Sequence, residues 1–236
     1  MGMSLSIVVP FRDADGTRTP AKEWILARWA HYYPEAEIVE APDDGLDPFN
    51  KCMAVNNAVA KSSGDILAIL DADSWVDETH VRRALKMVET GVAAWVIPCR
   101  TSWRLRQEVS ERIMALPPSA PWPLMKRMDA EQVGPVCGFL HIVTRKGLAQ
   151  LGGMDERIRG WGGEDTTFTM AMDRVVGRHR KLNGYVYSLW HARPRDGNHS
   201  RIWVGQDKSL EAEKRELTGR YVRARTREAM LEVIRR

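Results

Sequence analysis

The sequence has few cysteines and no long apolar run. Cys52, Cys99 and Cys137 are its three cysteines, an odd number without metal-site spacing, which argues against a disulfide scaffold and favours a reducing compartment. No apolar run approaches the roughly 20 residues needed to cross a bilayer. The first apolar run, residues 5–9, is too short for the core of a signal peptide. We therefore expect a cytoplasmic protein without a membrane span.

No linker, internal repeat or low-complexity tract divides the sequence. Hydrophobic residues make up 44% of the chain and charged residues 28%, an ordinary globular composition that permits a sizeable core. We predict one domain over about residues 1–200, followed by a basic helical extension over residues 201–236. Glutamates alternate with arginines and lysines in the extension. This pattern favours a solvated helix face over a surface that binds nucleic acid.

Strand-like and helix-like segments alternate along the sequence. Apolar, β-branched runs predict strands at residues 5–9, 36–41, 65–70, 92–98, 137–144 and 185–190. Amphipathic periodicity and capping residues predict helices at residues 19–33, 49–62, 77–90, 103–116, 145–151 and 164–176, and a helical tail from residue 209. The alternation predicts an α/β fold, with a mostly parallel central sheet flanked by helices.

One segment between these elements is irregular. Residues 117–123 contain four prolines around Trp122, a composition that excludes regular structure. Long irregular insertions in compact domains are often functional. A lid or binding platform and a merely variable surface excursion both remain open for this segment.

Charged residues follow several predicted strands directly. Arg12 follows the first strand, Asp43 and Asp44 follow the second, and Asp71 and Asp73 follow the third. In parallel α/β sheets, ligands bind beyond the carboxyl ends of the strands. We therefore expect the functional site at this edge of the sheet.

Asp71 and Asp73 form a pair of carboxylates separated by Ala72. Carboxylate oxygens at a strand end suit Mg²⁺ or Mn²⁺, usually with phosphates completing the coordination. Such a pair also arises from turn-making and capping residues. His191, after the last predicted strand, could join a Mn²⁺ site, although a lone histidine is more often structural.

A second stretch, residues 160–165 (GWGGED), contains three glycines, one tryptophan and two carboxylates. Glu164 and Asp165 begin a predicted helix, whose dipole and free N–H groups favour ionised carboxylates. They therefore suit the role of base or hydrogen-bond acceptor, although simple helix capping is the alternative. Trp161 beside them suggests a pocket for a sugar ring.

These stretches occur in an order that resembles a known family. The resemblance rests on residues 9–13 (VPFRD), residues 49–51 (FNK) with Asn56, residues 70–73 (LDAD), and the stretch from Gly138 through the GWGGED string to His191. The sequence is similar to the metal-dependent glycosyltransferases of the GT-A fold. It resembles the β-1,4-galactosyltransferases most and the polypeptide N-acetylgalactosaminyltransferases next. The resemblance spans about residues 5–195.

The resemblance implies a single Rossmann-like GT-A domain and the residues of its donor site. The nucleotide-binding part would be residues 1–100, and the acceptor and metal part residues 134–200. The implied nucleotide-binding residues are Pro10, Phe11, Arg12, Asp43, Asp44, Phe49, Lys51, Asp71 and Ala72. Phe49 and Lys51 would lie near the uracil. Lys51 stands where the galactosyltransferases have arginine.

The resemblance also implies metal and sugar sites. Asp73 and His191 would bind Mn²⁺, with Mg²⁺ possible and Asp71 near the ribose or the metal. Ser188 stands where the most similar relatives have a methionine ligand. The implied sugar-binding residues are Trp161, Gly162, Gly163 and Glu164.

The implied activity is Mn²⁺-dependent transfer of a hexose or N-acetylhexosamine from a UDP-sugar to a hydroxyl of a glycan or protein. We predict inversion, with Asp165 as the base and Glu164 as the second candidate. A retaining, polypeptide-type transferase is one alternative. An inactive glycan-binding or sugar-nucleotide-binding module is an alternative of another class, and nucleic-acid binding by the extension is a weaker one.

Overall fold

The computed structural model describes residues 2–13, 16–136, 138–160, 162–191 and 208–235. Cys137 and Trp161, both named above, lie outside these residues. The main sheet has six strands, and their burial explains their apolar sequences. In order they are β2 (Glu37–Ala41), β1 (Leu5–Pro10), β3 (Ile66–Leu70), β8 (Leu140–Thr144), β5 (Trp95–Ile97) and β9 (Arg180–Lys181).

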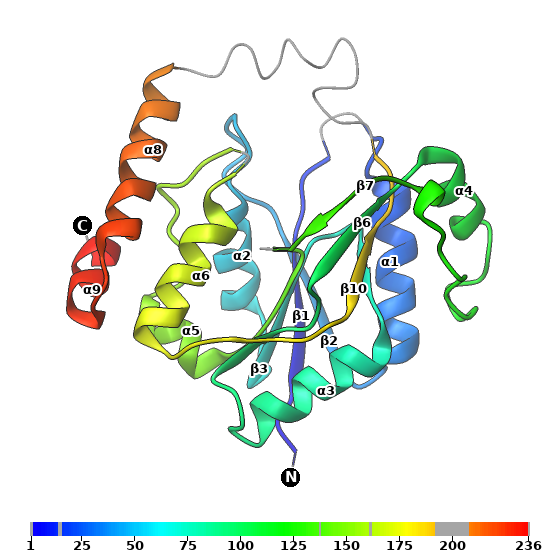
Figure 1. Cartoon of the computed structure of the whole chain (residues 1–236), viewed down its shortest axis with the longest axis horizontal. Helices are drawn as coiled ribbons and strands as arrows, with labels where there is room; N and C mark the ends of the chain where they lie inside the picture. Colours follow the sequence, from blue (N-terminus) through cyan, green and yellow to red (C-terminus); the bar gives the residue numbers. More distant parts are fainter. Residues whose placement is uncertain (1, 14–15, 137, 161, 192–207, 236) are drawn as a thin grey trace.

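The main sheet is mostly parallel, as the sequence predicts. Only β8 runs antiparallel to its neighbours β3 and β5, and the other pairs are parallel. Every residue of β3 is buried, which a continuous apolar run requires when helices cover both faces of a sheet. Figure 1 shows α2 (Lys51–Lys61), α5 (Arg145–Leu151) and α6 (Glu164–Val175) on one side of the strands and α1 (Thr19–Tyr32) on the other.

A smaller, four-stranded sheet contains elements that the sequence did not predict. Its order is β4 (Ser74–Val76), β10 (Tyr185–Ser188), β6 (Thr101–Leu105) and β7 (Ala130–Pro135). The helix predicted at 103–116 is wrong in its first part, because Trp103 lies in β6 opposite Tyr187 and Val133. The helix there, α4 (Gln107–Met114), begins later. Pairing partners far along the chain decide such short strands.

The helix predicted at residues 49–62 begins slightly later in the structure. Its N-cap is Asn50, whose side chain accepts the backbone N–H of Met53 at 3.0 Å. The helix predicted at residues 77–90 is α3 (Glu78–Glu89), with Asp77 as its N-cap. The short 3-10 turn η1 (Arg127–Asp129) precedes β7.

The irregular segment 117–123 is bound to α1. Arg28, 2% exposed, donates to the carbonyls of Pro118 and Ala120 at 2.7 and 2.6 Å, and the Trp24 indole donates to the carbonyl of Leu116 at 2.9 Å. Trp122 stacks on Trp75, with ring centroids 6.3 Å apart. This anchoring argues against a freely moving lid.

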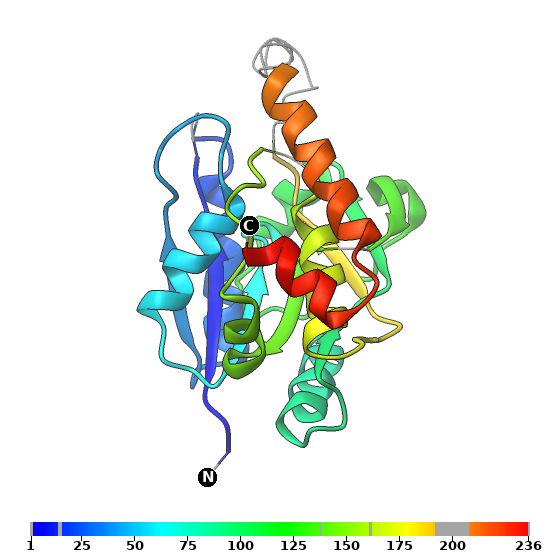
Figure 2. The same cartoon turned by 90° about the vertical axis from the view of Figure 1, so that its left-hand side faces the viewer.

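The described part of the C-terminal extension, residues 208–235, is helical, as predicted, but contains two helices. They are α8 (Lys208–Arg223) and α9 (Arg227–Arg235), which pack on α6 (Figure 2). Leu217, Tyr221, Met230 and Val233 of these two helices are buried. The boundary between domain and extension stays a prediction. Among the described helices, none combines the length and apolar composition of a membrane span, and the cytoplasmic location also stays a prediction.

Candidate active site

The ends of β1 and β2 bring a charged group together. Arg12 donates to the Leu46 carbonyl and to Asp47, both at 3.0 Å, and its guanidinium lies 3.6 Å from Asp43 and 5.3 Å from the centre of the Phe49 ring. The Asp43 side chain is fully buried and accepts the backbone N–H of Asn50 at 2.8 Å. Of the residues predicted around the nucleotide, Arg12, Asp43 and Phe49 are thus neighbours in space.

Arg159 is a residue of this edge that sequence reasoning missed. Its guanidinium contacts both carboxylate oxygens of Asp44, at 2.9 and 2.8 Å. This hydrogen bond lowers the pKa of the Asp44 carboxyl. The signal available in the sequence was a cation directly before residues 160–165 (GWGGED), the glycine-rich stretch. The pair joins the turn after β2 to that stretch.

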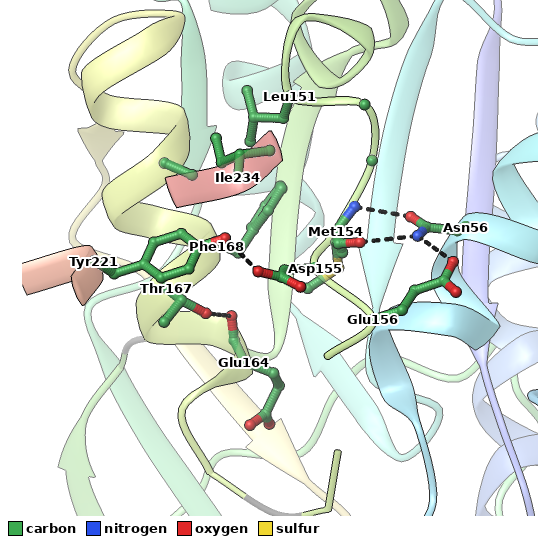
Figure 3. Close-up of a pocket in the computed structure, with 13 residues that line it drawn as sticks. Asn56, Leu151, Met154, Asp155, Glu156, Glu164, Thr167, Phe168, Tyr221 and Ile234 are labelled. Atoms are coloured by element: carbon green, nitrogen blue, oxygen red, sulfur yellow. Dashed lines mark hydrogen bonds between the residues drawn. The ribbon is translucent and has the colours of Figure 1, made fainter. Parts of the chain in front are cut away.

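The polar side chains of α2 hold the loop that leads into the glycine-rich stretch. Asn56 accepts the backbone N–H of Met154 at 2.8 Å and donates to the Met154 carbonyl and to Glu156, at 2.9 and 2.8 Å (Figure 3). Asn50 donates to the backbone carbonyl of Glu156 at 2.8 Å. The backbone N–H of Gly160 donates to the Phe49 carbonyl at 3.0 Å. These bonds explain why a crossover helix has such a polar face.

Lys51, at the start of α2, joins two predicted site carboxylates. Its ammonium lies 2.7 Å from Asp71 Oδ1 and 3.0 Å from Asp165 Oδ1. Burial works to raise the pKa of Asp165, but attraction to Lys51 and to the buried His141 outweighs it and lowers the pKa. Burial raises the pKa of Asp71, and Lys51 offsets only part of that effect. The negative charge is therefore better stabilised on Asp165 than on Asp71.

Gly138 packs against the other side of the Asp165 carboxylate. A Cβ atom at residue 138 would lie 1.9 Å from Asp165 Oδ2, a separation that non-bonded atoms do not reach. Only glycine permits this approach without moving the carboxylate. Asp165 is thus enclosed by Lys51 on one side and by backbone on the other.

Glu164 occupies a different environment in the same helical turn. It is 9% exposed, and its Oε2 atom is buried with no hydrogen-bond partner in the described part of the chain. Burial raises the pKa of Glu164, and the neighbouring Asp165 adds to this, whereas Lys51 opposes it. Gly162 and Gly163, with φ of 88° and 96°, make the turn that presents both carboxylates.

Asp73 and His191 lie together at the ends of β3 and β10. Asp73 Oδ2 accepts the Ser188 hydroxyl at 2.6 Å and lies 3.4 Å from His191 Nε2. Burial works to raise the pKa of Asp73, but the interactions with His191 and Ser188 lower it. Within the described residues, no group of three or more His, Cys, Asp and Glu side chains is arranged to hold a metal ion.

Comparison with known families identifies the chain. The family described as Glycosyl transferase family 2 matches residues 12–152, more than half of the chain. The chain belongs to this family. It is therefore a glycosyltransferase, and the alternative of an inactive binding module is set aside. No curated protein sequence matches the chain significantly.

The glycosyltransferase is also similar to solved structures. One is the catalytic domain of Drosophila β1,4-galactosyltransferase 7 in complex with xylobiose, at 15% identity and a TM-score of 0.51, covering 87% of this chain and 81% of that chain. Another is GalNAc-T7 with UDP, GalNAc and Mn²⁺, at 13% identity and a TM-score of 0.54, covering 94% of this chain but only 49% of that chain. The likeness confirms the GT-A fold.

A cavity of about 210 Å³ is lined by residues 151–156, by α6 and by the C-terminal helices. Figure 3 shows side chains of these elements around it. Tyr221 donates its hydroxyl to Asp155 at 2.8 Å across this cavity, and Glu164 forms part of its lining. The extension therefore supports the part of the chain that carries the two candidate bases.

Several of the predicted site residues of the glycosyltransferase thus form three sets. Asp71, Lys51 and Asp165 form one ion-paired group. Asp73 and His191 form a second. The Arg12 group described above is the third, and the function of each set stays a prediction.

Proposed function

We propose that this glycosyltransferase moves a hexose or N-acetylhexosamine from a UDP-sugar to a hydroxyl group of a glycan or protein, with inversion. One observation carries the proposal. The Lys51 ammonium group contacts both Asp71, which follows β3, and Asp165, which lies in the first turn of α6. Lys51 thus connects Asp71, a carboxylate placed to bind the donor, with Asp165, a base placed to accept the acceptor's proton. The solved complexes of similar fold support it, because those proteins hold UDP, GalNAc and Mn²⁺ in one case and xylobiose in the other.

The donor nucleotide would bind at the ends of β1 and β2. Arg12 supplies a cation for the diphosphate and Phe49 an aromatic face for the uracil, with their partner Asp43 shaping the pocket. The remaining proposed contacts are Pro10, Phe11, Asp44, Lys51, Asp71 and Ala72. Gly162, Gly163 and Glu164, together with Trp161, would face the transferred sugar.

The fit of a divalent metal rests on Asp73 and His191. A carboxylate oxygen and an imidazole nitrogen 3.4 Å apart are donor types that Mn²⁺ accepts, and Mg²⁺ is the second candidate. Asp71, paired with Lys51, is the remaining candidate ligand. When bound, a divalent cation neutralises charge on a diphosphate leaving group.

Asp165 would act as the base in a single displacement. The acceptor oxygen attacks the anomeric carbon, the bond from that carbon to the UDP oxygen breaks, and UDP keeps the electron pair. Asp165, whose pKa is lowered, is ionised and accepts the hydroxyl proton. Glu164, whose pKa is raised, is the second candidate. The retaining alternative differs in the anomeric configuration of the product.

A panel of UDP-sugars tests the proposal. The protein is incubated with each donor, Mn²⁺ and candidate acceptors, and released UDP is measured.

Asp73→Asn should lower turnover at least tenfold and weaken Mn²⁺ binding, measured by electron paramagnetic resonance without donor. Asp165→Asn should abolish transfer while UDP binding persists. Turnover that is unchanged in Asp73→Asn would contradict the metal assignment, and NMR of the product anomer decides between inversion and retention.

A further inference from the structure

The ammonium group of Lys51 is the point where three separate parts of the chain meet. Lys51 belongs to the first turn of α2, Asp71 follows β3, and Asp165 belongs to the first turn of α6. The Lys51 side chain is 14% exposed, and those of Asp71 and Asp165 are 28% and 16% exposed. The group is therefore largely shielded from water. In such an environment ion pairs are strong and unpaired charges are costly.

The charges around Lys51 are unbalanced without it. Asp71 and Asp165 share the single ammonium, and Glu164 lies near enough to interact with both carboxylates and with Lys51. Like charges in a poorly solvated site repel each other. Loss of Lys51 would leave these carboxylates to separate or to take up protons.

The backbone around Lys51 is also held firmly. Asn50 caps α2 and donates to the Glu156 carbonyl, and Asn56 binds the backbone of Met154. The lysine therefore projects from a fixed helix towards a carboxylate that Gly138 supports from behind. Such an arrangement defines one position for the Asp165 carboxylate.

We propose that Lys51 is a positioning residue for the transfer step, which fixes Asp165 by anchoring it to Asp71. The assignment of a reaction step rests on the function proposed above. Lys51 does this through its contacts with the two carboxylates, and not through the uracil contact that the resemblance implies. The two roles differ in kinetics. A nucleotide-binding lysine affects donor affinity, whereas a residue that places the base affects the rate of turnover.

Steady-state kinetics on the full chain distinguish these roles. Lys51→Met should lower kcat for UDP release by about 100-fold, since small displacements of catalytic groups have effects of this size, while the donor KM changes less than about threefold. Lys51→Arg, which keeps the charge, should recover part of kcat. Lys61→Met, at the exposed end of the same helix, is the matched control and should behave as wild type. A raised donor KM with unchanged kcat would overturn the proposal.

A stability cycle tests the same contacts without any turnover. Lys51→Met should lower the Tm, and adding Asp165→Asn to it should restore several degrees, because one of the opposed carboxylates is removed. In the wild-type background, Asp165→Asn should not raise the Tm comparably. Equal effects of Asp165→Asn in both backgrounds would overturn the proposal. The Tm measurements need no turnover of a UDP-sugar. A wrong donor assignment and a wrong role for Lys51 therefore remain distinguishable.

Discussion

Gly138 and Asp165 show how closely individual residues are fitted in this site. Gly138→Ala would place a Cβ atom 1.9 Å from Asp165 Oδ2, so the carboxylate must move. We expect kcat to fall about 10- to 100-fold, with a smaller change in the Tm. Gly134→Ala is the control, because a Cβ atom there meets nothing within 4 Å. Equal kinetics for both variants would show that the Asp165 position does not matter.

Glu164 predicts a pH-dependent stability difference. Burial raises its pKa in the folded protein above the unfolded value. The protonated form of Glu164 therefore favours folding. This stabilisation is fully present below the unfolded pKa and is lost as the pH rises through the folded pKa. Glu164→Gln, measured by urea unfolding, should be more stable than wild type by about 1 kcal/mol at neutral pH, because it removes a buried negative charge that Asp165 and Asp71 repel.

The advantage of Glu164→Gln should disappear on acidification. The exposed Glu23 on α1 provides the control, and Glu23→Gln should differ little from wild type at any pH. A Glu164→Gln advantage that grows as the pH falls would contradict the sign of the shift.

At the scale of elements, Arg28 is one of the α1 side chains that hold the segment 117–123. Arg28→Met removes the donors to the Pro118 and Ala120 carbonyls. It also removes a cation that packs on aromatic rings, among them Trp75 at 4.4 Å. We expect a loss of about 2–4 kcal/mol in urea unfolding and faster proteolysis within residues 117–123. Arg83→Met, exposed on α3, should change stability by less than about 0.5 kcal/mol. Unchanged proteolysis in Arg28→Met would refute the anchoring.

The elements also show which sequence signals were sufficient. The continuous apolar runs of β1 and β3 and the period of α5 and α6 predicted those elements within a few residues. The strands β4, β9 and β7 were missed, because their short or polar sequences become strands only through pairing with distant partners. Tertiary contacts therefore determine β4, β6 and β7 of the smaller sheet, whereas β10 was predicted from the sequence.

At the scale of the whole molecule, the extension and the catalytic part are in contact. Tyr221 and Met230 are buried against α6, and Arg157 donates to the Val233 carbonyl at 2.8 Å. Deletion of residues 208–236 should therefore lower the Tm by at least about 5 °C, which corresponds to a few kcal/mol in a chain of this size, or cause aggregation on gel filtration.

Val222→Ser is the control for the deletion. Val222 is 53% exposed on α8, so this variant should keep the wild-type Tm and elution volume. A truncated chain that keeps the wild-type Tm and does not aggregate would instead show that the extension does not stabilise the rest of the chain.

The sequence by itself determined the alternation of strands and helices, the strand-end carboxylates Asp71 and Asp73, and the adjacent Glu164 and Asp165. The alternation follows from local periodicity, and the carboxylates are recognised by their places after a strand and at the start of a helix. Only the tertiary structure decided which charges meet. Lys51 pairs with Asp71 and Asp165, and Arg159 pairs with Asp44, although each pair except Lys51–Asp71 joins residues more than a hundred positions apart. Electrostatic pairing depends on distance in space, which sequence periodicity does not encode.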